Sequence, residues 1–131
     1  MFKMLCIIKV FMNDKVLFVF MTGRENMAKL LANIGMAGKI KSADPNITVE
    51  MIFLTPAVEA LNKKQVIFRP IIDTINDAKK VGVKVVACEV AMKNVGLDKE
   101  DIEDGLVDEY APIGGIYVLN KIKEGYEVLT I

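Results

Sequence analysis

A short run of β-branched residues at positions 83–88, VKVVAC, constrains the fold of this chain more than any other segment. It is typical of a strand in a parallel sheet, because such strands are buried on both faces and lose the alternation of half-exposed strands. Residues 89–95 then form a helix-compatible segment that ends at Gly96. The junction between strand and helix therefore falls on Cys88. In open α/β sheets, ligands bind outside the carboxyl ends of the strands, so Cys88 is the candidate functional residue.

Three further segments are predicted to be strands, the last from a weak alternation of apolar and polar residues. They lie at residues 15–21, 47–54 and 126–131, and the first two contain unbroken apolar runs. Val107 indicates an additional, very short strand. Strands that alternate with helices predict a parallel sheet with right-handed crossovers. We therefore expect an α/β fold: three layers, α/β/α, around a mostly parallel sheet of about five strands.

Helical periodicity marks the segments between these strands. After the turn at 22–24, apolar residues recur at the spacing of one buried helix face. They are Met27, Leu30, Leu31, Ile34 and Ala37. Pro70 opens a second helix, and Gly82 ends it as a C-cap. The pair Thr55-Pro56 predicts a short helix with the threonine as its N-cap. The loop at 63–65 is either a plain connector or a lid over the strand ends.

The last predicted helix begins at Ala111-Pro112 and has almost no polar face. Its apolar positions are Ile113, Ile116, Tyr117, Val118 and Leu119. A helix that is apolar nearly all round must be covered on more than one side, and in a small domain another subunit can supply that cover. Before it, Asp98 and Asp101 have the spacing of a capping box. We interpret Gly114-Gly115 as helix-entry glycines, because the sequence contains no phosphate-loop motif.

Composition excludes several classes of function. The 131 residues include 17 basic and 17 acidic side chains, and this balance argues against an electrostatic nucleic-acid binder. Histidine is absent, which excludes His-dependent triads and His-containing zinc sites. The two cysteines, Cys6 and Cys88, form no disulfide framework. We expect no metal, no cofactor and a reducing, cytoplasmic environment.

Residues 1–14 are interpreted as an N-terminal extension to a single domain at 15–131. The apolar stretch at its start is broken by Lys3 and Lys9, so it is too short and too charged to span a membrane. It also lacks the cleavage site of a signal peptide. Met12 offers a second start site, and the other interpretation is an added edge strand. We expect the core to fold without the residues before Met12.

From residue 82 to Gly105, the sequence resembles the DsrE/DsrF/TusD family of sulfur-relay proteins. The resemblance rests on four features in order. A strand ends in Ala-Cys at Cys88, the adjoining helix carries Met92, a glycine follows at Gly96, and an acidic helix ends at Gly105.

The likeness extends to the opening strand with Thr22-Gly23 and to the helix at 111–125, so it covers about residues 15–131. It implies a flavodoxin-like or Rossmann-like sheet, a homotrimer or a hexamer, and a cysteine that carries sulfane sulfur as a persulfide. By motif position, that cysteine is Cys88. The candidate substrate-binding residues are Gly23, Glu89, Met92 and Tyr110.

The leading hypothesis is a sulfur carrier or sulfurtransferase. The Cys88 thiolate would take sulfane sulfur from a donor protein or a small polysulfide and pass it to an acceptor cysteine. Unpaired N–H groups at the helix start favour the thiolate, whereas the neighbouring carboxylate of Glu89 opposes it. A buried and inert Cys88 would instead indicate a non-catalytic oligomeric binding module or a structural partner of a sulfur-relay complex. The third alternative is a thiol redox protein, for which Cys6 is the available resolving cysteine.

Overall fold

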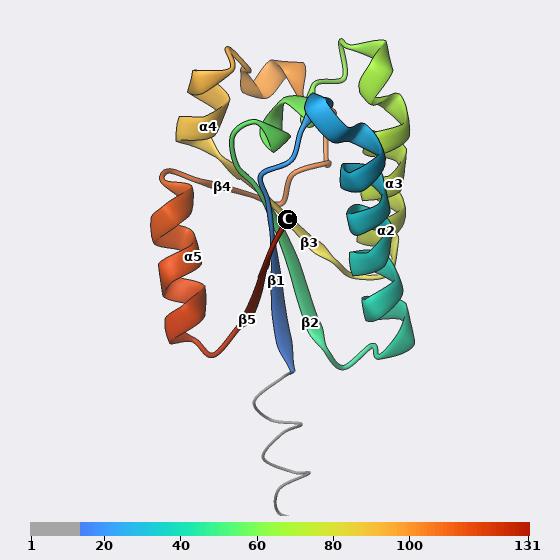
Figure 1. Ribbon diagram of the computed structural model, residues 1–131, viewed down its shortest axis with the longest axis vertical. Coiled ribbons are helices and arrows are strands. Elements are labelled where there is room, and N and C mark those ends of the chain that lie inside the picture. Colours follow the sequence, from blue (N-terminus) through green and yellow to red (C-terminus); the bar gives the residue numbers. More distant parts are fainter. Residues whose placement is uncertain (1–13) are drawn as a thin grey trace, which may run out of the picture.

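A computed structural model describes residues 14–131, which form three layers with the sheet in the middle (Figure 1). The sheet has five strands, all parallel, in the order β4-β3-β2-β1-β5. This confirms the predicted α/β class and the parallel sheet of about five strands. Met12, Cys6 and most of the predicted extension at 1–14 lie outside the described residues, so the boundary at residue 15 stays a prediction.

The predicted strands agree with the structure to within one residue at each end, apart from the shortest. The five are β1 (Lys15–Phe20), β2 (Thr48–Phe53), β3 (Lys84–Cys88), β4 (Glu109–Ala111) and β5 (Glu127–Thr130). The short strand expected at Val107 begins two residues later, at Glu109. Asp108 precedes it, and both its N–H and its carboxylate bond to the backbone of Val85, at 2.8 Å each. Regular pairing with β3 therefore starts only after Asp108.

Helices cover both faces of the sheet. They are α2 (Met27–Ala43), α3 (Arg69–Lys80), α4 (Glu89–Asn94) and α5 (Gly114–Lys123). Short 3-10 helices are η1 (Arg24–Asn26), η2 (Ala57–Leu61), η3 (Val66–Phe68) and η4 (Lys99–Asp101). In Figure 1, α2 and α3 lie on one side of the sheet and α5 lies on the other. Gly82 has φ +105° just after α3, where glycine is favoured because other residues rarely adopt this conformation.

Two helix starts differ from the prediction. Thr55 does not cap a helix: its hydroxyl accepts a hydrogen bond from the Asn94 side chain at 3.3 Å, and η2 begins after Pro56 without a side-chain cap. Ala111 does not begin the last helix, because it is the final residue of β4 and pairs with Cys88. The helix α5 therefore starts at Gly114.

The loop at 63–65 is bonded to the capping box at η4. Asp98 and Asp101 form the capping box as predicted, with both reciprocal hydrogen bonds present. The loop at 63–65 is fixed to the same turn, since the Lys63 N–H donates to the Asp101 carbonyl at 2.9 Å. The Lys64 ammonium also lies 2.6 Å from the Asp101 carboxylate.

The core is split into two parts by the sheet. Phe18 and Phe20 of β1 point toward α2 and α3, and the Phe20 ring stacks on Phe53 with 5.2 Å between centroids. Leu17 and Val19 alternate with them and point toward α5, where the smaller part of the core lies. Because helices cover both faces of the central strands, β1, β2 and β3 are largely apolar on both sides. The layer under α5 nevertheless also holds a buried carboxylate, described below.

Candidate active site

Cys88 lies where the connections of two neighbouring strands diverge. After β3, the chain returns to β4 on the side of α2 and α3, since Ile102 and Leu106 pack in that part of the core. After β4, it crosses to α5 on the opposite face (Figure 1). Ligands of open α/β sheets bind at such a divergence, outside the carboxyl ends of the strands. Cys88 is the last residue of β3 and pairs with Ala111 of β4, so it occupies this position.

Two backbone N–H groups donate hydrogen bonds to the Cys88 sulfur. The Ala91 nitrogen, in the first turn of α4, lies 3.4 Å from Sγ. The Gly114 nitrogen, at the start of α5, lies 3.2 Å from Sγ. Amide donors and the first turn of a helix stabilise negative charge on sulfur. The arrangement therefore places two N–H donors, supplied by two different elements, on the sulfur.

Gly114 reaches the sulfur because it has no side chain. A Cβ at this position would lie 2.3 Å from Leu54 Cδ2 and 3.1 Å from Cys88 Sγ. At Gly115, by contrast, a Cβ would have no neighbour within 4 Å. Only the first glycine of the pair is needed at the sulfur. Sequence reasoning treated both as helix-entry glycines and missed this role.

The sulfur is enclosed. Cys88 is 5% exposed and belongs to the core that faces α2 and α3. A reagent or a partner protein must therefore displace neighbouring side chains before it reaches Sγ. The same enclosure would protect a reactive sulfur species from water and oxidants.

Three of the four predicted substrate-binding residues gather beside Lys99. The Glu89 carboxylate lies 3.4 Å from the Lys99 ammonium. The same ammonium lies over the Tyr110 ring, 4.5 Å from its centroid. Glu89 and Met92 also line a shallow cavity of about 150 Å³ together with Lys99. Lys99 is therefore the cation that pairs with Glu89, the carboxylate next to Cys88 in the sequence.

Gly23 lies elsewhere. It follows β1, which is separated from β3 by β2. Its N–H donates to the Glu25 carboxylate at 2.8 Å, and a Cβ there would lie 3.0 Å from the Pro56 carbonyl oxygen. Gly23 thus permits close packing of two loops, and the structure gives it no contact with Cys88.

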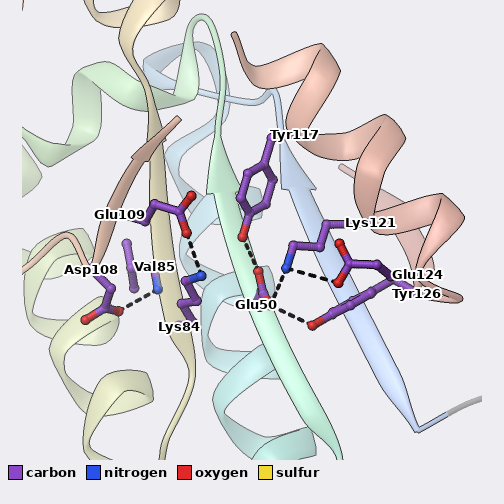
Figure 2. Close-up of polar contacts among 9 residues, drawn as sticks. All are labelled: Glu50, Lys84, Val85, Asp108, Glu109, Tyr117, Lys121, Glu124 and Tyr126. Atoms are coloured by element: carbon purple, nitrogen blue, oxygen red, sulfur yellow. Dashed lines mark hydrogen bonds and ion pairs between the residues drawn. The ribbon is translucent and has the colours of Figure 1, made fainter. Parts of the chain in front are cut away.

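A second polar group lies under α5 (Figure 2). Glu50, in β2, is 4% exposed and accepts hydrogen bonds from the Tyr117 hydroxyl, the Tyr126 hydroxyl at 2.7 Å and the Lys121 ammonium at 3.2 Å. Nearby, Lys84 and Glu109 form an ion pair at 2.6 Å. Sequence reasoning did not single out Glu50. A carboxylate inside a strand that is otherwise apolar was the available signal, because a buried charge requires partners.

Opposing effects act on the pKa of Glu50. Burial raises this pKa, but the hydrogen bonds from Tyr117 and Tyr126 and the charge of Lys121 outweigh it, so the pKa lies below its ordinary value of 4.5. Burial and the hydrogen bond to Glu50 raise the pKa of both tyrosines. At neutral pH, Glu50 is therefore an ionised acceptor and the two phenols are protonated donors.

Comparison with known protein families identifies the family of this chain. The model of the DsrE/DsrF-like family matches residues 14–131. The chain belongs to the DsrE/DsrF-like family. This confirms the resemblance in the sequence, and it connects the chain with a family associated with sulfur relay. A search of the curated proteins found no match.

Solved structures share the DsrE/DsrF-like chain's fold. The YchN protein of E. coli has 15% identity and a TM-score of 0.70, over 89% of this chain and 99% of that one. A protein of unknown function from Methanobacterium thermoautotrophicum has 14% identity and a TM-score of 0.69, over 89% and 97%. One from Bacteroides thetaiotaomicron has 19% identity and a TM-score of 0.68, over 90% and 95%. At these identities, the comparison supports a common fold alone.

The described part of the DsrE/DsrF-like domain has neither a cluster of metal ligands nor a helix that could span a membrane. Within residues 14–131, no group of three or more cysteine, aspartate or glutamate side chains is arranged to hold a metal ion. In the same part of the chain, every helix is too short or too polar to cross a bilayer.

Proposed function

We propose that this chain carries sulfane sulfur as a persulfide on Cys88 and passes it to an acceptor protein. The observation that most supports this role is the pair of N–H donors, from Ala91 and Gly114, on the Cys88 sulfur. Both donors could hydrogen-bond to a persulfide on Cys88 and hold it in place during transfer. Membership of the DsrE/DsrF-like family supports the sulfur-relay context.

The proposed transfer has two steps. The Cys88 thiolate attacks the outer sulfur of a donor persulfide, R–S–SH, or of a small polysulfide. The S–S bond of the donor breaks as the new S–S bond forms, and the donor leaves as the thiolate R–S⁻. An acceptor thiolate then attacks the outer sulfur on Cys88, and Cys88 leaves as a thiolate. Each step exchanges one S–S bond for another, so no external oxidant or reductant is consumed.

Partner docking is the proposed way to reach the sulfur. Exposed apolar residues follow the carboxyl ends of three strands: Met21 after β1, Val90 after β3 and Ile113 after β4. A donor or acceptor protein that binds these residues would contact the segments that enclose Cys88. We further propose that the protein works in the reducing cytoplasm, where thiols stay free, and that it acts as a homotrimer or a hexamer.

Mass spectrometry of the intact protein tests the proposal. After treatment with inorganic polysulfide, the wild type should gain mass in steps of one sulfur atom and lose it on reduction. Cys88→Ser should abolish the gain. Cys6→Ser is the matched control, since it removes the other cysteine and should leave the gain intact. Labelling that persists in Cys88→Ser would mean that Cys6 carries the sulfur.

The burial of Cys88 favours one alternative, a non-catalytic binding module or structural partner of a sulfur-relay complex. At 5% exposure, the thiol can also be explained as core packing. Alkylation of the folded protein separates the two functions. A Cys88 that resists iodoacetamide until the chain unfolds, in a protein that also takes up no sulfur, would identify the module.

A further inference from the structure

The buried carboxylate of Glu50 has no part in the sulfur transfer described above, yet its hydrogen-bond partners all lie on or next to α5 (Figure 2). Tyr117 and Lys121 belong to α5, and Tyr126 follows it in the turn before β5. Gly114, the first residue of the same helix, donates to Cys88. One helix thus connects Glu50 with the sulfur.

The residues of α5 that contact Cys88 and Glu50 lie on the same stripe of the helix. Gly114, Tyr117, Val118 and Lys121 recur at three- and four-residue intervals, the spacing of one helix face, and they are the more buried positions of α5. With a rise of about 1.5 Å per residue, Tyr117 lies roughly 4.5 Å along the axis from Gly114. Glu50 therefore holds α5 about one turn from the donor to the sulfur.

Directional contacts are needed to hold α5 at one rotation and one height. The apolar layer beneath it is small, with Leu17, Val19, Ile52, Val86 and Ala111 as its buried residues. Apolar burial is non-directional and tolerates small rotations and shifts of a helix. Hydrogen bonds weaken steeply when their geometry changes, and buried polar groups can select one arrangement among several. Glu50 supplies such contacts to both Tyr117 and Lys121.

We propose that Glu50 is a positioning residue for Cys88. Through Tyr117 and Lys121, it sets α5 so that the Gly114 N–H donates to the sulfur. Its effect on sulfur transfer rests on the function proposed above, whereas its effect on the Gly114 N–H does not. Loss of these bonds lets α5 rotate or slide, which lengthens the 3.2 Å contact between the Gly114 nitrogen and Sγ.

Two tyrosine variants form a matched pair for the test. Tyr117→Phe and Tyr126→Phe each remove one hydroxyl that donates to Glu50, and each keeps its ring. Only the first hydroxyl lies on the inward stripe of α5. The first readout is the amide proton shift of Gly114 in a ¹H–¹⁵N NMR spectrum, with Cys88→Ala as the reference for a lost N–H···S bond. Tyr117→Phe and Glu50→Gln should move this resonance toward the reference, and Tyr126→Phe should move it less.

The second readout is the rate at which polysulfide-treated protein loses its added sulfur to a small thiol. Tyr117→Phe should lose it roughly threefold to tenfold faster than the wild type, the factor expected when one charge-assisted hydrogen bond weakens. Tyr126→Phe should stay within about twofold of the wild type. A purely structural role would lower the melting temperature without moving the Gly114 resonance.

The outcomes separate the two proposals. A Gly114 resonance that stays unmoved in Tyr117→Phe overturns the positioning role, whatever the sulfur assay gives. Equal shifts in the two tyrosine variants also overturn it, because the effect would then not pass through α5. A wild type that takes up no sulfur overturns the proposed function alone, since the Gly114 resonance still decides the positioning role. If Glu50→Gln fails to fold, the milder Tyr117→Phe decides the question.

Discussion

At residue 114, the backbone of α5 comes within hydrogen-bonding distance of the Cys88 sulfur, and a side chain there would collide with Leu54. The neighbouring Gly115 faces open space. A methyl group added at Gly114 would therefore meet close neighbours, whereas one added at Gly115 would meet none. This contrast allows the close approach to the sulfur to be tested with a single methyl group.

Gly114→Ala should destabilise the fold by about 1–3 kcal/mol, the usual cost of overpacking a tight site. Gly115→Ala places the same methyl group one residue later and should be neutral or stabilising by up to about 1 kcal/mol, because alanine favours a helix over glycine. Urea denaturation measures both changes in the free energy of unfolding. Equal effects at the two positions would show that α5 does not press against the sulfur.

Acid should weaken the contribution of Glu50. Its pKa is lowered in the folded protein, so its stabilising effect is present above the ordinary value of 4.5 and is lost as pH falls through the lower, folded-state value. Glu50→Gln should cost about 1–3 kcal/mol at pH 7. We expect the difference from wild type to stay constant down to about pH 5 and to shrink in more acid solution. Urea denaturation at a series of pH values measures it, and a difference that grows on acidification would contradict the assignment.

The position of Cys88 at the end of a strand could be predicted from sequence, whereas the contact partners of Glu50 and Gly114 could not. Cys88 lies at the junction between a strand pattern and a helix pattern, and both can be recognised in the local sequence. Glu50 finds its partners 67 and 76 residues away, at Tyr117 and Tyr126. Gly114 is recognised only through Leu54 and Cys88, which approach it from other elements. Contacts of this kind depend on the three-dimensional arrangement and leave no periodic signal.

Among the elements, α5 has two unlike faces. Its inner stripe carries Tyr117 and Lys121 against the sheet. Its outer side is apolar and 48–53% exposed at Ile113, Ile116, Leu119 and Ile122. The expected lack of a polar face is therefore found on the side that the sheet leaves uncovered. The part of this row beyond Ile113, at Ile116, Leu119 and Ile122, is what a second subunit would cover.

Ile116→Glu should shift the protein from the proposed oligomer toward the monomer. A charge in the centre of an apolar interface must be buried without a partner, which opposes association. Light scattering at micromolar concentration measures the mass. Val66→Glu is the control, since this apolar residue of η3 is 84% exposed on another surface and its change should leave the mass unaltered. A wild type that is already monomeric would contradict the proposed assembly.

Element starts were predicted less well than element types. Strand runs and helical spacing are local, and they located β1, β2, β3 and β5 closely. The start of α5 was misjudged because Pro112 suggested a helix beginning, while Ala111 is held in β4 by its pairing with Cys88. The pairing of β4 with β3 therefore sets the start of α5 later in the chain than the local sequence pattern predicted.

For the whole molecule, alternation of strands and helices predicted the layered parallel sheet but not the order of its strands. Residues 16 and 127 pair across β1 and β5, which places the last strand beside the first. Nothing in the local pattern of either strand indicates that neighbour. The order follows from α5, which carries the chain from one edge of the sheet across its face to the other.

This crossover also affects how the molecule folds. Every strand pair is parallel, so no two neighbours can meet through a tight turn, and each pairing must close a long loop. Closing a loop costs chain entropy before the new contacts stabilise the fold. The pairing of β1 with β5 closes the longest loop of the sheet. Gly114 lies on the segment that makes this closure. Its N–H bond to the Cys88 sulfur spans only 26 residues, so we expect that contact to form before β5 pairs with β1.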